Sequence, residues 1–197
     1  MRGNTYSKNQ SSEKISRKLS EFIKEIQYKN RNPVDNNVLK MLQEIETNPE
    51  LLFDSQQYLY RSRIVHSKDK LNGEYPFFGF GKDGSFVAPS ECTKDMRANY
   101  RYIPYLYYAT RPYLSVVEVR PRLGTRVSVA RIRVNERLRL LDFSLQNYPK
   151  GMKSVKINLF HALSQLYSKP VTEDDDTLDY IPTQYIAEFV KKIGYDG

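Results

Sequence analysis

The residues best suited to chemistry lie in one short stretch of this chain, which holds an arginine, a tyrosine and a glutamate. Arg97, Tyr107 and Glu118 fall on segments expected to form a loop, a short strand and a short helix. A guanidinium can hold a diphosphate through paired hydrogen bonds, and an aromatic ring can stack on a flat cation. A carboxylate can stabilise the positive charge that develops on a sugar as its glycosidic bond breaks. These residue types therefore suit a site that binds a dinucleotide and stabilises a ribosyl cation.

Glu118 has two interpretations that the residues alone leave open. It stands among apolar neighbours, where it can pair with Arg120 or Arg122 on a helix face or face a pocket and stabilise a cation. At a separation of about 4 Å and an effective dielectric constant of about 20, its attraction to a cation is roughly 4 kcal/mol. Realised mainly in the transition state, that attraction raises a rate about a thousandfold. Tyr107 likewise fits either a stacking role or core packing with a bonded hydroxyl.

Further arginines have the same two interpretations. Arg61 and Arg63 are two residues apart on an expected strand, so both point to one face of it. They can extend their charged heads into solvent, or they can hold a pyrophosphate in bidentate fashion. Arg97 and Asn99 on the expected loop carry the same ambiguity.

Two other patterns are less specific. Gly79–Gly84 matches G-x-G-x-x-G, but the residues that follow it, Ser85–Pro89, do not open a helix, so we interpret it as a glycine-rich turn. The arginines between Arg120 and Arg139 fit a solvated sheet face, a contact with a partner protein or a nucleic-acid surface. Neither pattern decides the function.

Composition and charge bound the class of protein. The 197 residues are 40% hydrophobic and 13% aromatic, which suffices for one domain of ordinary size with a small appendage. A net charge of +8 implies attraction to nucleic acid, a phosphorylated small molecule or an acidic protein, without choosing among them. No apolar run reaches the roughly 18 residues of a membrane span. One cysteine and two histidines argue against a metal site and for a reducing compartment, so we expect a cytoplasmic protein.

The spacing of apolar residues predicts an α+β fold. Alternating patterns predict strands over 58–65, 105–109, 125–134 and 138–143. Helical spacing predicts helices from Glu13 to Asn32-Pro33, from an Asp35 N-cap to Asn48-Pro49, from Pro112 to Arg120, from Lys153 to Tyr167 and from Pro182 to Gly194. Strands and helices do not alternate regularly, which favours α+β over a doubly wound parallel sheet.

In this order, these residues resemble the RES-domain family. The matching segments are Tyr60–Arg63, Arg97–Asn99, Leu106–Ala109, Glu118–Pro121, Val127–Ala130, Leu141–Phe143, Tyr180–Gln184 and Gly194–Gly197. Pro76–Gly81 is similar to the longer members of the family, which carry an extended N-terminal part. We therefore expect a disordered tail over residues 1–11, a helical extension over 12–54 and a RES-like catalytic domain over 55–197.

The resemblance implies an ADP-ribosyltransferase-like fold, in which a split pair of small β-sheets with flanking helices surrounds an NAD⁺ cleft. Many RES proteins are toxins that destroy NAD⁺ and are silenced by a cognate antitoxin. The implied activity is that of an NAD⁺ glycohydrolase or phosphorylase, with NAD⁺ as substrate and no cofactor. By position, Arg61 would hold the phosphates, and Tyr107 would stack on the nicotinamide. Glu118 would engage the nicotinamide ribose as the catalytic residue, and Arg97 would brace the cleft.

This sequence departs from the family pattern at two places. Met96 stands where the family usually has glycine, and the family continues past the equivalent of Gly197 into a strand with an active-site serine. We therefore expect the catalytic domain to be truncated at its C-terminus. A mono-ADP-ribosyltransferase and a non-catalytic nucleic-acid-binding module are the alternatives. Val116 stands where arginine-directed transferases commonly carry a second glutamate, which favours hydrolysis.

Overall fold

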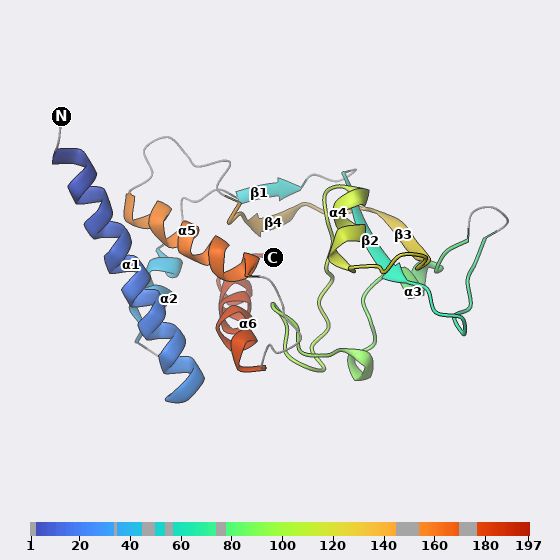
Figure 1. Cartoon of the computed structure of the whole chain (residues 1–197), viewed down its shortest axis with the longest axis horizontal. Coiled ribbons are helices and arrows are strands. Elements are labelled where there is room, and N and C mark those ends of the chain that lie inside the picture. Colours follow the sequence, from blue (N-terminus) through green and yellow to red (C-terminus); the bar gives the residue numbers. More distant parts are fainter. Residues whose placement is uncertain are drawn as a thin grey trace. The chain divides into compact units, whose positions relative to one another are not determined.

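The computed structural model describes residues 3–33, 35–44, 50–53, 57–73, 78–144, 154–169 and 177–197, and Figure 1 shows the order of its elements. The predicted helix limits at Asn48-Pro49 and Lys153, and the first two residues of Pro76–Gly81, lie outside the described residues. The described chain contains helices and two separate two-stranded sheets, so the predicted α+β class is confirmed. In this part of the chain, no helix is both long and apolar enough to cross a membrane.

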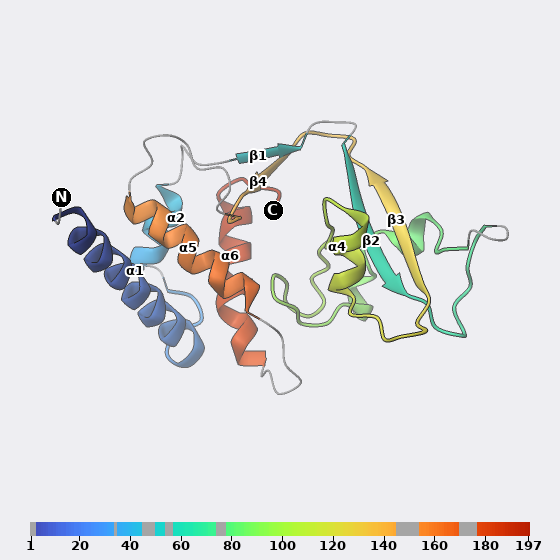
Figure 2. The same cartoon turned by 45° about the horizontal axis from the view of Figure 1, so that its top comes forward.

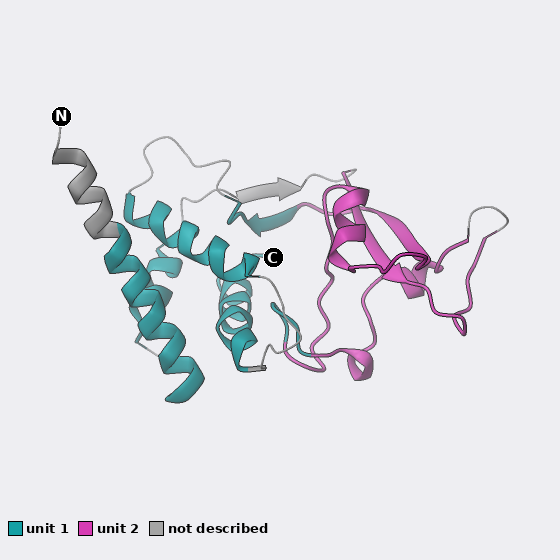
Figure 3. Ribbon diagram, viewed as in Figure 1, with its two compact units in different colours: residues 1–52, 95–99, 138–197 teal, residues 53–94, 100–137 magenta. Residues whose placement is uncertain are grey.

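The chain divides into two compact units (Figure 3). Unit 1 comprises residues 1–52, 95–99 and 138–197, and unit 2 comprises residues 53–94 and 100–137. The elements of unit 1 are α1 (Gly3–Tyr28), α2 (Asn37–Gln43), β1 (Glu50–Phe53) up to Leu52, β4 (Leu138–Leu141), α5 (Ser154–Ser168) and α6 (Thr177–Lys192). The elements of unit 2 are β2 (Tyr58–Ile64), α3 (Lys82–Ser85), the 3₁₀ turn η1 (Ser90–Cys92), α4 (Pro112–Glu118) and β3 (Val127–Arg133).

The core of unit 1 is built from helices that come from both ends of the chain. Helix α1 packs against α5 and α6 (Figure 2). The buried apolar residues of α1 recur at the predicted helical spacing, and those of α5 and α6 meet them in one cluster. The main members of this cluster are Ile15, Leu19, Phe22, Ile26, Leu159, Phe160, Leu163, Ile186 and Val190. The N-terminal helices therefore belong to the same packed unit as the C-terminal ones.

Helix α1 begins earlier than the sequence predicts. It starts at Gly3, within the segment that was expected to be a disordered tail, and not at Glu13. No proline interrupts the residues from Asn4 to Ser12. Once the packed part of a helix is formed, each added residue gains a hydrogen bond without a new nucleation cost. The helix can therefore extend to Gly3 without an apolar stripe there.

The N-cap of α2 is Asn36, and the predicted Asp35 cap is wrong. The Asn36 side-chain oxygen accepts a hydrogen bond from the Val38 N–H at 2.8 Å, as an N-cap residue does. Asp35 instead forms an ion pair with Lys40. The two residue types are equally good caps, so the backbone decided between them.

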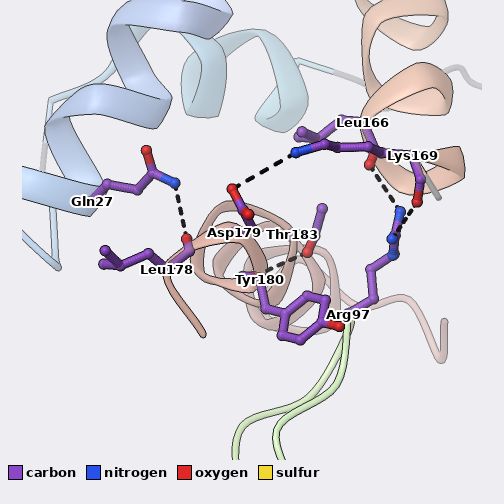
Figure 4. A network of polar contacts seen from close by, with 8 residues as sticks. All are labelled: Gln27, Arg97, Leu166, Lys169, Leu178, Asp179, Tyr180 and Thr183. Atoms are coloured by element: carbon purple, nitrogen blue, oxygen red, sulfur yellow. Dashed lines mark hydrogen bonds and ion pairs between the residues drawn. The ribbon is translucent and has the colours of Figure 1, made fainter. Parts of the chain in front are cut away.

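Helix α6 also begins before its predicted start. The sequence placed that start at Pro182, but this proline lies inside the helix. The helix starts at Thr177 and contains Pro182. Proline has no N–H to donate to the carbonyl four residues back, which is that of Leu178. The Gln27 side chain of α1 donates to this Leu178 oxygen at 2.9 Å (Figure 4). A side chain from the other end of the chain thus replaces the hydrogen bond that the proline removes.

Unit 2 is built around the antiparallel ribbon of β2 and β3, on which α4 packs (Figure 2). The predicted strands over 58–65 and 125–134, and the predicted helix starting at Pro112, are confirmed within a few residues. The predicted strand over 105–109 is wrong. It makes a single bridge, in which Ala109 and Tyr60 exchange two hydrogen bonds of 2.8 Å. The chain turns into α4 at Pro112, which ends the pairing.

Candidate functional site

The two faces of the β2–β3 ribbon carry different residues. In the antiparallel register, Arg61 lies opposite Ala130 and Arg63 opposite Ser128. Because side chains alternate along a strand and directly paired residues share a face, these four residues lie on one side, which we call the arginine face. Ser62 lies on the other side of the ribbon.

Helix α4 packs on the side opposite to the arginine face. The Ser62 hydroxyl lies 2.8 Å from the Ser115 hydroxyl of α4, and both residues are buried. The Ser115 hydroxyl also donates to the Pro112 carbonyl at 2.7 Å. Since a hydroxyl has one proton, Ser62 is the donor in the pair of serines. Glu118, the last residue of α4, is therefore carried by a helix that covers the face away from Arg61.

Arg61 and Arg63 are held by backbone carbonyls. An Nη1 of Arg61 donates to the Phe86 carbonyl, and an Nη1 of Arg63 donates to the Gly84 carbonyl. The Arg63 guanidinium carbon also lies 4.1 Å from the centre of the Phe80 ring, within the range of a cation–π contact. Within the described residues neither arginine forms an ion pair with a carboxylate.

No carboxylate among the described residues offsets the charge of this pair. Burial lowers the pKa of Arg61, and the positive charge of Arg63 lowers it further. Both causes disfavour the cationic form of Arg61, which remains charged at physiological pH because an arginine titrates so far above it. An anion bound at the arginine face would offset the repulsion between Arg61 and Arg63.

Glu118 and Tyr107 are both accessible to solvent. The Glu118 side chain is exposed. Pairing with Arg120 or Arg122 was one of its two interpretations from the sequence, and within the described chain Glu118 forms no ion pair with either arginine. Tyr107 lies in irregular chain two residues before Ala109, with its side chain 37% exposed. Water around an exposed carboxylate weakens its attraction to a cation, so Glu118 can act strongly only once a bound molecule has displaced that water.

Arg97 and Asn99 belong to unit 1, where Arg97 binds the end of a helix. Its Nη1 donates to the carbonyls of Leu166 at 3.2 Å and Tyr167 at 2.5 Å, and its Nη2 donates to that of Lys169. Figure 4 shows the guanidinium directed at this end of α5. The last carbonyls of a helix have no intrahelical partner and carry a partial negative charge, which a cation stabilises. Arg97 therefore caps α5.

Gln184 holds the loop that carries Arg97, a role the sequence analysis did not assign. Its side chain is 1% exposed, and its amide nitrogen donates to the carbonyls of Met96 at 2.9 Å and Asn99 at 2.8 Å. Asn99 is itself buried, with 1% of its surface exposed. A glutamine among the apolar positions of the last predicted helix, two residues before Ile186, is the signal that could have indicated a buried polar partner.

A cavity of about 210 Å³ lies beside Arg97 in unit 1. Its polar lining includes Arg97, Lys169, Asp179 and Tyr180, and an ion pair of 3.8 Å joins Lys169 to Asp179 (Figure 4). Its charged groups are thus engaged with partners of the same unit. The cavity is smaller than the 300–1,000 Å³ typical of ligand pockets.

The structure thus distributes the predicted site residues over both units. Arg61 and Arg63 lie together, Tyr107 and Glu118 belong to the same unit as that pair, and Arg97 and Asn99 belong to unit 1. The described residues contain no group of three or more histidine, cysteine or acidic side chains that could hold a metal ion. No protein-family model, curated protein or solved structure matches the chain.

Proposed function

We propose that the protein is an NAD⁺ glycohydrolase or phosphorylase that breaks the bond between nicotinamide and ribose. The observation that carries this proposal is the pair Arg61 and Arg63, which lie side by side with only neutral carbonyls as described hydrogen-bond partners. A single guanidinium presents paired N–H donors that match the oxygens of a diphosphate, and Arg61 and Arg63 place two such groups on one strand face. NAD⁺ carries such a diphosphate between its two ribose groups.

Electrostatics favours an anion at this pair over the present neutral partners. Hydrogen bonds between a charged donor and a charged acceptor are roughly twice as strong as those between neutral groups. The lowered pKa of Arg61 reports that burial and the neighbouring Arg63 disfavour its charge. A bound diphosphate would offset both charges, and the net charge of +8 would draw it to the protein.

In this proposal Tyr107 and Glu118 act on the other half of the substrate. Because α4 covers the side of the ribbon opposite to Arg61, NAD⁺ would have to reach around the edge of the ribbon to meet both groups. The Tyr107 ring would stack on the nicotinamide, and the Glu118 carboxylate would engage the ribose and stabilise the cation that forms at C1′. Nicotinamide leaves with the electrons of the broken C1′–N bond, and water or phosphate forms the new bond to C1′, with an attacking water giving up one proton to the solvent. The exposure of both side chains leaves them accessible to a substrate, which would exclude water as it binds.

The resemblance to RES proteins supports the same proposal and extends it. We propose an ADP-ribosyltransferase-like arrangement for the catalytic part, NAD⁺ as substrate rather than cofactor, and a toxin's role in the cytoplasm. An antitoxin protein that silences it is the proposed partner. The alternatives are transfer of ADP-ribose to a macromolecule and binding of nucleic acid without catalysis.

Release of nicotinamide from NAD⁺ by the purified protein tests the proposal. We expect Glu118→Gln to lower the rate about a thousandfold, from the roughly 4 kcal/mol of a carboxylate–cation attraction. We expect Arg61→Ala to raise the KM for NAD⁺. Glu136→Gln, which changes another exposed carboxylate of unit 2, is the matched control and should leave the rate unchanged. Equal rates for wild type and Glu118→Gln contradict hydrolysis at this site.

Labelled NAD⁺ separates the alternatives in the same experiment. Label that becomes attached to a macromolecule indicates transfer, whereas free ADP-ribose indicates hydrolysis. Retention of nucleic acid that falls steeply with salt and survives Glu118→Gln indicates the binding module.

A further inference from the structure

The glycine-rich segment Gly79–Phe86, which we call the 79–86 turn, supplies the acceptors of both arginines. It contains the single helical turn α3 and lies on the arginine face. The Gly84 carbonyl accepts from Arg63 and the Phe86 carbonyl accepts from Arg61. The proposed function makes no use of this turn. Its backbone oxygens nonetheless occupy N–H donors that the oxygens of a diphosphate would need.

Among the described residues, the 79–86 turn is held by a few contacts to the ribbon and to Asn72. The Phe80 N–H donates to the Ser128 hydroxyl at 3.0 Å, and the Phe80 ring lies against the Arg63 guanidinium. Gly79 exchanges two backbone hydrogen bonds with Asn72, of 2.7 and 2.9 Å. All these partners are neutral apart from the two arginines, and a charged ligand can outcompete the hydrogen bonds that the arginines donate to the turn.

Glycine lets the backbone approach its neighbours closely at two positions of the turn. A Cβ atom at Gly79 would lie 2.9 Å from the Ser128 hydroxyl oxygen, and one at Gly84 would lie 3.1 Å from the Phe80 Cβ. Both distances are shorter than ordinary van der Waals contact between such atoms. The glycines thus allow a close approach of the backbone, and the carbonyls of Gly84 and Phe86 accept hydrogen bonds from the two arginines.

We propose that the 79–86 turn is a displaceable latch, which occupies Arg61 and Arg63 in the resting protein and is released when a diphosphate binds them. This inference rests on the proposed function, since it takes the arginine pair as the diphosphate site. A carbonyl carries only a partial charge, so the charged oxygens of a diphosphate form the stronger hydrogen bonds with both guanidiniums. The ligand therefore stabilises the released state and shifts the population toward it.

A latch of this kind sets the affinity of the site. Only the released fraction of the protein binds, so the apparent dissociation constant exceeds the intrinsic one in proportion to how rarely the latch is open. A change that weakens the closed latch and leaves both arginines in place must therefore tighten binding. This consequence distinguishes a latch from a turn that merely supports the site, because weakening a support loosens binding.

Hydrogen exchange of the whole chain with inorganic pyrophosphate tests the release directly. We expect saturating pyrophosphate to speed exchange at the amides of Gly79, Phe80 and Ser85, whose hydrogen bonds hold the turn. Amides of the β2–β3 ladder serve as the internal reference and should keep their protection. Unchanged or slower exchange at the turn, with pyrophosphate bound, overturns the latch.

Titration of two matched variants with pyrophosphate provides the second measurement. Phe80→Ala removes the ring that holds Arg63, and we expect about threefold tighter binding from the typical strength of such a contact. Tyr58→Ala is the control, because it removes the ring stacked 4.5 Å from Arg131 and should leave the affinity unchanged. Weaker or unchanged binding by a folded Phe80→Ala variant overturns the latch. If that variant does not fold, the hydrogen-exchange measurement on the wild-type chain decides the question.

The latch and the proposed function fail in distinguishable ways. Pyrophosphate has no nicotinamide, so its binding is independent of the cleavage reaction. Release of the turn by pyrophosphate without nicotinamide release from NAD⁺ supports the latch and contradicts the enzyme. Cleavage of NAD⁺ with a turn that stays protected contradicts the latch alone. If pyrophosphate does not bind, or binds equally to Arg61→Ala, the diphosphate site and the latch are both wrong.

Discussion

Replacement of Gln27 by leucine should destabilise unit 1 because it removes the donor that stands in for the missing N–H of Pro182. The Gln27 amide lies 2.9 Å from the Leu178 carbonyl oxygen, between residues 151 positions apart. A hydrogen bond of this kind contributes about 1 kcal/mol to the free energy of unfolding. For a chain of this length, 1 kcal/mol corresponds to a fall in Tm of about 2–4 °C.

A double-mutant cycle with Pro182→Ala isolates this contact. Alanine restores an N–H that can donate to the Leu178 carbonyl within α6, so Gln27→Leu should cost less in that background. Pro182→Ala by itself should stabilise the protein, since a proline inside a helix is about 3 kcal/mol less favourable than alanine. Urea unfolding of the four proteins gives the coupling free energy directly.

The control for the added apolar side chain is Gln43→Leu, at an exposed position of α2. We expect it to change the midpoint of urea unfolding by less than Gln27→Leu does. The reasoning is refuted if Gln27→Leu unfolds at the same urea concentration as the wild type. It is equally refuted if the cost of Gln27→Leu is the same with proline and with alanine at position 182.

Two further outcomes follow from the described contacts. Ser115→Ala should lower the free energy of unfolding by about 1–3 kcal/mol, and Ser62→Ala by about 1 kcal/mol. The alanine at position 115 costs more because it removes both the acceptor of the Ser62 hydroxyl and the donor to the Pro112 carbonyl. Urea unfolding that ranks the two variants the other way contradicts the assigned donor. Burial, and after it the charge of Glu25, raise the pKa of Tyr185 above its usual 10.0. The folded state then keeps the Tyr185 proton after the unfolded state has lost it. The contribution of Tyr185 to the free energy of unfolding is therefore present below about pH 10 and is lost as the pH rises through the pKa of the folded state. Unfolding at pH 9 and pH 11 should show that loss in the wild type and not in Tyr185→Phe, and an equal loss in both proteins assigns it elsewhere.

Helix α6 illustrates where a local rule of sequence interpretation fails. Its periodic apolar residues were predicted correctly, but Pro182 indicated a start at that residue, because proline is tolerated in a first turn and disfavoured further along. The helix nevertheless begins five residues earlier, at Thr177, and Gln27 from the opposite end of the chain supplies the hydrogen bond to Leu178 that the proline cannot. No pattern within α6 contains that information.

The arginines show the same limit for the candidate site. Their types and the two-residue spacing of Arg61 and Arg63 correctly predicted that these two share a strand face. The capping of α5 by Arg97 could not be predicted, because its acceptors are backbone carbonyls more than 60 residues away, which every residue type possesses. The roles of Glu118 and Tyr107 toward a substrate stay predictions.

By itself the sequence determined the α+β class, the apolar stripes of α1, α5 and α6, and the ribbon strands, since these follow from the periodicity of neighbouring residues. Only the tertiary structure decided that α4 and the 79–86 turn lie on opposite faces of that ribbon. It also decided which carbonyls the arginines bind. Hydrogen-bond partners are chosen by proximity in space, and packing brings together groups whose separation along the chain carries no signal.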